Sequence, residues 1–311
     1  MKELIKADIY KETKKKSFKL IIFLIPIVVL FSLIIIKNNL QKETYENKLD
    51  EISYYEINKK GNYNKYSNSY EKYKEKENLI NEINSTEKES KVRDLIVNST
   101  PIYYIIGFFI IYIVFNNFSY DLNYKTLKYV FLSGNSKAKI YLSKIIGITI
   151  ISISLLLYSS TLALILSHLL TKSSPLLIAK MIYINHSFIK VPLVIYSLLL
   201  SLKFLIPITF ITFLTSLLSL LFKGNTFGLI ISILIYIFSS SVLNICLIHN
   251  LSFIKYTFVP YIDYTYFSGI SYLYVNAIYN TNITEKLGFI VLAIYSIIFA
   301  RLSINLYKKD L

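Results

Sequence analysis

The chain has 311 residues, 54% of them hydrophobic, and several apolar runs of about 17 or more residues predict a polytopic α-helical membrane protein. This pattern excludes a soluble globule and a β-barrel. The net charge of +15 gathers at the ends of the apolar runs, as topology signals do, which argues against a nucleic-acid-binding protein. The single cysteine, Cys246, lies in an apolar run, so the chain has no internal disulfide and no CxxC metal site.

Residues 1–19 are rich in lysine and predict an amphipathic interfacial helix on the cytoplasmic leaflet, held by apolar burial and by attraction to anionic lipid. Four apolar residues fall near one face of this helix: Leu4, Ile5, Ile9 and Tyr10. The next apolar run, residues 20–37, is too long for a signal-peptide core and lacks a cleavage site. It is therefore predicted to remain as span 1, with a kink at Pro26.

Residues 38–100 differ most in composition from the rest of the chain. Their basic and acidic side chains nearly balance, and a polar segment of this length can be translocated despite its lysines, so it is predicted to be extracellular. Weak apolar stripes, interrupted around residues 61–69, favour a helical hairpin over a disordered loop. Composition leaves open whether this insertion contacts a substrate or is a solvated spacer.

Span 2, residues 101–118, leads into a polar loop at 119–144 that is predicted to face the cytoplasm because its lysines far outnumber its one acid, Asp121. Apolar residues recur every three to four positions before Ser133 and predict a short helix with one apolar face. The lysines of this loop are Lys125, Lys128, Lys137, Lys139 and Lys144.

The polar residues of this loop follow a recognisable order: Asp121, Lys125 and Thr126, Ser136 and Lys137, and Lys144. In this order the loop resembles the first cytoplasmic loop of ABC-2 type transporter permeases. In that family the loop contains a coupling helix, which sits in a groove of a separate ATPase subunit. The resemblance therefore implies an ATPase-docking surface on this chain, formed by Tyr120, Asp121, Lys125, Thr126 and Lys128.

Four further spans are predicted: span 3 at 145–170, span 4 at 201–222, span 5 at 226–248 and span 6 at 287–306. A serine-rich face of span 3 suits close helix packing, and its members are Ser152, Ser154, Ser159 and Ser160.

The segments between and after these spans complete the topology. Residues 171–200 are predicted to be extracellular or interfacial, a tight cytoplasmic turn follows span 4, and residues 307–311 form a cytoplasmic tail, so both termini face the cytoplasm. Residues 249–286 are rich in tyrosine. The resemblance implies external re-entrant helices that cap the translocation path there, and an ordinary aromatic belt explains the tyrosines equally well.

The sequence carries no motif that would make this chain an enzyme. It has no phosphate-binding P-loop, no HExxH and no GxSxG, so we expect no ATP hydrolysis, cofactor or metal in this chain. No Asp or Glu lies in the central part of a predicted span, whereas ion-coupled carriers generally need such groups. Energy for any transport would then come from outside the chain.

Together with the resemblance, these observations imply the permease subunit of an ATP-driven ABC exporter in a bacterial plasma membrane. Its expected partners are a separate ABC ATPase subunit, a second permease copy in a homo- or heterodimer, and membrane lipids. The substrate class implied is amphipathic: an antimicrobial peptide, an antibiotic or a lipid. The alternative is a non-transporting immunity or sensor protein whose extracellular domain at 38–100 binds a peptide. A secondary carrier or membrane enzyme is disfavoured by the missing carboxylates.

Overall fold

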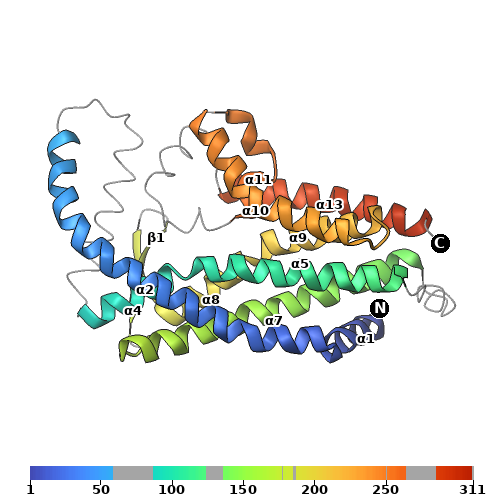
Figure 1. Cartoon of the computed structure of the whole chain (residues 1–311), viewed down its shortest axis with the longest axis horizontal. Helices are drawn as coiled ribbons and strands as arrows, with labels where there is room; N and C mark the ends of the chain where they lie inside the picture. Colours follow the sequence, from blue (N-terminus) through green and yellow to red (C-terminus); the bar gives the residue numbers. More distant parts are fainter. Residues whose placement is uncertain are drawn as a thin grey trace. The chain divides into compact units, whose positions relative to one another are not determined.

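The computed structural model describes residues 1–58, 87–123, 136–176, 178–184, 187–249, 251–263 and 285–309. The chain is mostly helical (Figure 1). Within these ranges, six helices or joined helix pairs are long and apolar enough to cross a membrane, which agrees with the predicted number of spans in a mostly helical chain. Their bounds are Lys16–Asn39, Lys91–Leu122, Lys137–Thr171, Leu193–Leu221, Thr226–Leu243 and Lys286–Tyr307.

The first two helices meet at a single residue with extended backbone. Helix α1 spans Lys2–Lys14, and Lys15, at φ −62° and ψ 140°, separates it from α2, Lys16–Asn58. Helix α2 continues well past the predicted end of span 1 at residue 37, and α4, Glu87–Val97, lies in the same predicted insertion. Both ends of the insertion are thus helical, while the interruption around 61–69 lies outside the described residues.

The chain divides into two compact units. One unit comprises Met1–Ile25, Tyr103–Tyr158 and Ser201–Leu311, and the other comprises Pro26–Ile102 and Ser159–Leu200. The first contains α1, most of α5 (Thr100–Asn123), the beginning of α7 (Lys137–Thr171), and the helices from α9 onward, listed here: α9 (Leu205–Leu221), α10 (Thr226–Ile248), a 3₁₀ turn η1 (Ser252–Tyr256), α11 (Val259–Ile262) and α13 (Glu285–Lys309).

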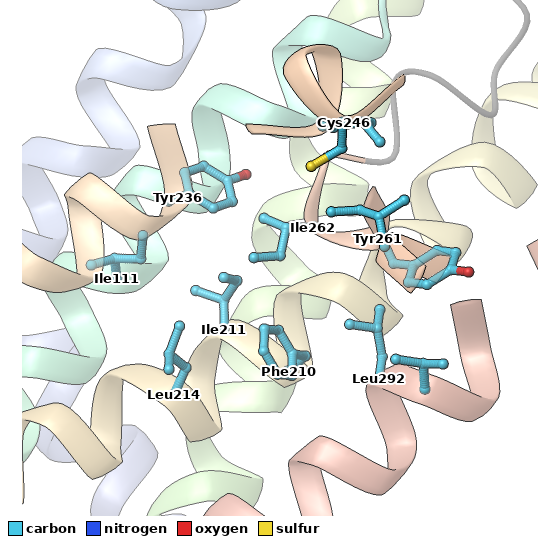
Figure 2. Close-up of a cluster of buried hydrophobic side chains, with 12 residues drawn as sticks. Ile111, Phe210, Ile211, Leu214, Tyr236, Cys246, Tyr261, Ile262 and Leu292 are labelled. Carbon is cyan, nitrogen blue, oxygen red and sulfur yellow. The ribbon is translucent and has the colours of Figure 1, made fainter. Parts of the chain in front are cut away.

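The core of this first unit is built from apolar side chains of α5, α9, α10, α11 and α13. Figure 2 shows Phe210 and Ile211 of α9 facing Tyr236 of α10 and Leu292 of α13. Tyr261 of α11 is 1% exposed and donates its hydroxyl to the Lys255 carbonyl oxygen at 2.9 Å. Most spans are apolar on all sides, so burial in this core selects which face of each helix points inward.

Helices α9 and α10 are joined by a turn whose sequence dictates its geometry. Lys223 and Gly224 have positive φ, and the Gly224 N–H donates to the Ser219 carbonyl at 2.8 Å, which completes a Schellman motif. Asn225 Oδ1 then accepts from the Phe227 N–H at 3.3 Å and so caps α10. These local signals explain why α10 has the predicted bounds of span 5.

Substitution of the cap tests this turn. We expect Asn225→Ala to lower the free energy of unfolding by about 1 kcal/mol, because the first turn of α10 loses its side-chain acceptor. Asn225→Asp keeps an acceptor at the same place and should leave stability nearly unchanged. Equilibrium unfolding of the detergent-purified protein, followed by circular dichroism, measures both. Equal stability of the two variants would contradict the capping role.

The second unit contains an antiparallel hairpin that sequence analysis did not predict. Strands β1 (Ala179–Ile184) and β2 (Ser187–Pro192) pair in register from Ala179 opposite Pro192 to Ile184 opposite Ser187. Residues 171–200 were expected only to be extracellular or interfacial. The signal for strands was the density of β-branched and aromatic residues on both sides of a two-residue connection, which is typical of a hairpin.

Helix α8, Leu193–Lys203, follows the hairpin and is separated from α9 at Phe204. Pro207 explains the break, because proline lacks an N–H and its ring would collide with the Lys203 carbonyl in a continuous helix.

The predicted serine face of α7 is largely buried: Ser152, Ser159 and Ser160 are 0% exposed, whereas Ser154 is exposed. Ser160 contacts Ser197 of α8, with 2.7 Å between the hydroxyl oxygens.

Candidate functional site: a buried polar network beside the loop 124–135

Eight polar residues from three helices form a network at one end of the first unit. They are Asp8, Lys11, Glu12 and Lys15 around α1, Asn117 and Asp121 on α5, and Ser143 and Lys144 on α7, and we refer to them as the polar network. Three carboxylates face three ammonium groups. Formal charge is therefore balanced, which is the condition under which buried ionic groups are tolerated.

Asp121 is the centre of the ionic contacts. Its carboxylate forms an ion pair with Lys144 and accepts a second bond from Lys11 Nζ at 2.9 Å. The Asp121 and Lys144 residues are only 4% and 3% exposed. In such surroundings the attraction between opposite charges is much less screened than at the surface, and loss of either partner would leave an uncompensated buried charge between α5 and α7.

A second chain of contacts joins α1 to the same lysine. Lys144 Nζ donates to Asn117 Oδ1 at 3.0 Å, and Asn117 Nδ2 donates to Glu12 Oε1 at 2.8 Å. Lys15 reaches the same Glu12 oxygen at 2.5 Å. The amide of Asn117 thus uses both its acceptor and its donor side between a cation and an anion, which fixes its orientation.

The helical spacing of the residues accounts for their convergence. Asp8 and Glu12 are four residues apart on α1, and Asn117 and Asp121 are four apart on α5, so each pair lies on one helix face. Ser143 Oγ lies 2.9 Å from Asp8 Oδ2. Gly147, one turn further along α7, also lies beside α1: a Cβ there would lie 3.5 Å from Asp8 and 3.6 Å from Ile9, at ordinary van der Waals distance.

Tyr120 borders the network at the surface. Tyr120 is 40% exposed, and the ammonium groups of Lys11 and Lys15 lie 4.7 Å and 5.6 Å from the centre of its ring. These distances are within the range of cation–π attraction. Tyr120 therefore presents one ring face to the lysines that also bind Asp121 and Glu12.

Aromatic contacts connect the network to the ends of α9 and α13. The Phe118 ring lies 5.4 Å from Lys144 Nζ and packs against Tyr141 and Tyr307 at 5.6 Å and 6.5 Å between ring centres. The hydroxyl of Tyr141 lies 2.9 Å from Ser216 Oγ of α9. A displacement of the network would therefore disturb contacts with four helices, α5, α7, α9 and α13. Each of them is a candidate span or part of one.

Of the five residues predicted to dock an ATPase, two are described. Helix α5 continues past the predicted end of span 2 at residue 118 and reaches Asn123, so Tyr120 and Asp121 lie in its last turns. Tyr120 is exposed, whereas the carboxylate of Asp121 is buried in the network. Lys125, Thr126 and Lys128, and the short helix expected around them, lie outside the described residues.

Sequence reasoning did not identify the α1 members of the network. The lysines of residues 1–19 were expected to face lipid, but Lys11 and Lys15 bind carboxylates instead. The available signal was the pair of acids at Asp8 and Glu12 within a lysine-rich helix, which could have indicated a face that needs a polar partner. No metal-binding group of three or more His, Cys, Asp or Glu occurs in the described ranges.

A family model described as "Protein of unknown function (DUF2705)" matches residues 71–310. No curated protein and no solved structure matches the chain. The matched range begins before α4 and includes the α5 and α7 members of the network, while α1 lies outside it.

Proposed function

We propose that this chain, which belongs to the DUF2705 family, is the permease subunit of an ATP-driven exporter whose ATP is hydrolysed on a separate subunit. The observation that supports this most directly is the ion pair between Asp121 and Lys144. Asp121 lies three residues before the segment 124–135 and Lys144 lies shortly after it, so the pair joins the two helices that carry this segment.

In the proposal, the polar network couples the two helices that carry this segment to α1. Asp121 belongs to α5, Lys144 to α7, and Lys11 brings in α1, so a force on the loop would move three helices as one body. A subunit that hydrolyses ATP needs such a connection to drive a rearrangement of spans. In the proposal, Asp121 acts as a positioning residue that holds the loop, and contact with the ATPase is made by Tyr120, Lys125, Thr126 and Lys128.

The distribution of acids in the spans supports an external energy source. In the described parts of the six candidate spans, Asp and Glu occur only near the ends, as at Asp94 and Asp121. Carriers driven by protons or sodium generally place ionisable groups near mid-membrane, where a carboxylate is otherwise costly. The chain offers apolar, hydroxyl and aromatic side chains instead, which suits an amphipathic substrate such as a peptide antibiotic or a lipid.

The proposal includes an arrangement for the complete transporter. Two permease copies, identical or different, form the path with two ATPase subunits, in a bacterial plasma membrane. The polar network and both chain ends face the cytoplasm, where the ATPase subunits reside. The excess of lysine on the network side of the chain supports this orientation.

Affinity purification of the tagged chain from its host, in mild detergent, tests the proposal. We expect a P-loop ATPase to copurify in roughly equal amount and to hydrolyse ATP. Thr126→Trp with Lys125→Glu should reduce the copurified ATPase at least about tenfold, the equivalent of about 1.4 kcal/mol, by blocking the docking surface. Lys139→Glu, at an exposed position at the start of α7, is the matched control and should retain the partner.

Two results would overturn the proposal. One is a stable chain that brings down no ATPase, which would favour an immunity or sensor protein that works through residues 38–100. The other is full retention of the ATPase by the double variant, which would remove the docking role from the loop.

A further inference from the structure

The junction of α1 and α2 exposes a group of lysines that the polar network does not use. Lys14, Lys16 and Lys19 are exposed and form no ion pair with a carboxylate in the part of the chain that the structure describes. Lys14 Nζ lies 5.3 Å from the ring centre of Tyr10, which is 65% exposed. We refer to Lys14, Lys16 and Lys19 as the elbow lysines.

The elbow lysines differ from the lysines of the network in exposure and in partners. Lys11 and Lys15 are directed toward Asp121 and Glu12 and are partly buried. Lys15 interrupts the helix with an extended backbone, and its two neighbours in sequence, Lys14 and Lys16, are exposed. The structure thus divides one basic sequence into a group that binds protein carboxylates and a group that faces outward.

The apolar surface beside the elbow lysines belongs to α2. Ile9 of α1 packs beside Gly147 of α7, so its side chain contacts protein. On α2, exposed apolar residues follow Lys16 at intervals of three and four, and they are Leu20, Phe23, Ile27, Phe31 and Ile34. This spacing places Lys16 at the end of an exposed apolar stripe on one helix face, with Lys19 beside it.

We propose that the elbow lysines bind the phosphate headgroups of anionic phospholipids, while the apolar stripe of α2 contacts the acyl chains of the same leaflet. The chemistry is complementary, because the ammonium groups lie at the end of a span, where phospholipid headgroups lie. The exposed side chains of Leu20 and Phe23 follow one helical turn after Lys16 and Lys19, toward the acyl chains. The exposed ring of Tyr10 suits the same interface, because tyrosine has an apolar body and a polar tip. The inference is independent of the transport function.

The test compares lipid binding by variants of the full chain. The detergent-purified protein is titrated with phosphatidylglycerol or phosphatidylcholine, and retained lipid is counted by native mass spectrometry. We expect the wild type to prefer phosphatidylglycerol. The triple variant K14Q/K16Q/K19Q should lose at least about tenfold of that preference, since each lysine near an anionic surface contributes about a fivefold effect. High salt should weaken the wild-type preference in the same direction.

A charge-matched variant controls for net charge. K2Q/K139Q/K223Q removes three exposed lysines elsewhere and should keep the wild-type preference. Thermal unfolding in phosphatidylcholine alone confirms that both triple variants are folded. Equal phosphatidylglycerol retention by the two triple variants would overturn the site. Displacement of the lipid by inorganic phosphate at matched phosphate concentration would also overturn it, because it would indicate a site for a soluble anion.

Discussion

Replacement of Asp121 by alanine is expected to lower the free energy of unfolding by about 3–5 kcal/mol, because it leaves the buried Lys144 without a carboxylate. Lys144 would keep its hydrogen bond to Asn117 Oδ1 at 3.0 Å and its contact with the Phe118 ring, but neither partner is charged, and Lys11 would lose its bond of 2.9 Å. A cation this deeply buried needs a paired anion, and Lys144 forms no ion pair with another carboxylate in the described ranges. The protein contains no Trp and 28 Tyr, so tyrosine fluorescence or circular dichroism can follow unfolding in detergent.

Two further variants distinguish loss of the buried pair from general damage. Asp121→Ala combined with Lys144→Met removes both charges and should recover much of the stability, since the two introduced side chains are apolar and no buried charge of this pair is left without its partner. Glu3→Ala breaks the surface pair with Lys6, whose side chains are 83% and 63% exposed, and should cost less than about 1 kcal/mol. If Asp121→Ala were as mild as Glu3→Ala, the network would not stabilise this end of the fold.

Gly107→Ala is expected to have the second large effect, through the contact between α5 and α10. A Cβ at Gly107 would overlap the Tyr236 hydroxyl and lie 2.5 Å from its Cζ. The rings of Tyr104 and Tyr236 stack at 4.4 Å, and each hydroxyl donates to the other residue's carbonyl, at 2.7 and 2.8 Å. Overpacking and the strain on two hydrogen bonds should together lower the free energy of unfolding by about 1–5 kcal/mol. This range already includes the stabilisation from the higher helix propensity of alanine.

Gly147→Ala is the matched control for this substitution. The nearest atoms to its added Cβ lie at 3.5 Å or more, which is ordinary van der Waals contact. Without a clash, the gain in helix propensity should make the variant neutral or more stable by up to about 1 kcal/mol. Opposite signs for the two glycines in the same unfolding assay would support the reciprocal tyrosine contact, and equal effects would contradict it.

The family match covers only part of the polar network. Its α5 and α7 members lie within residues 71–310, whereas Asp8, Lys11, Glu12 and Lys15 precede that range. The pair of Asp121 and Lys144 can therefore be tested separately from the contribution of α1. Asn117 connects the two parts, since it binds Lys144 on one side and Glu12 on the other.

The sequence by itself determined that the chain is mostly helical, with six segments long and apolar enough to span a membrane. A long apolar run is a local property of composition, and lipid requires that its backbone be helical, so no knowledge of packing is needed. The turn before α10 was equally local, because Gly224 and Asn225 supply the positive φ and the cap at fixed places. That is why residues 226–248 were predicted with the bounds that α10 has.

Only the tertiary structure decided which charges meet. The contacts of α1 with α5 and α7 join residues 105 to 135 positions apart, as in those of Glu12 with Asn117 and of Asp8 with Ser143, and side-chain spacing carries no information over such separations. Burial then turned Asp121 from an expected surface residue into the centre of an ion-pair cluster. The hairpin was missed for a related reason, since short apolar runs fit strands and helices equally until pairing of β1 with β2 satisfies their backbone.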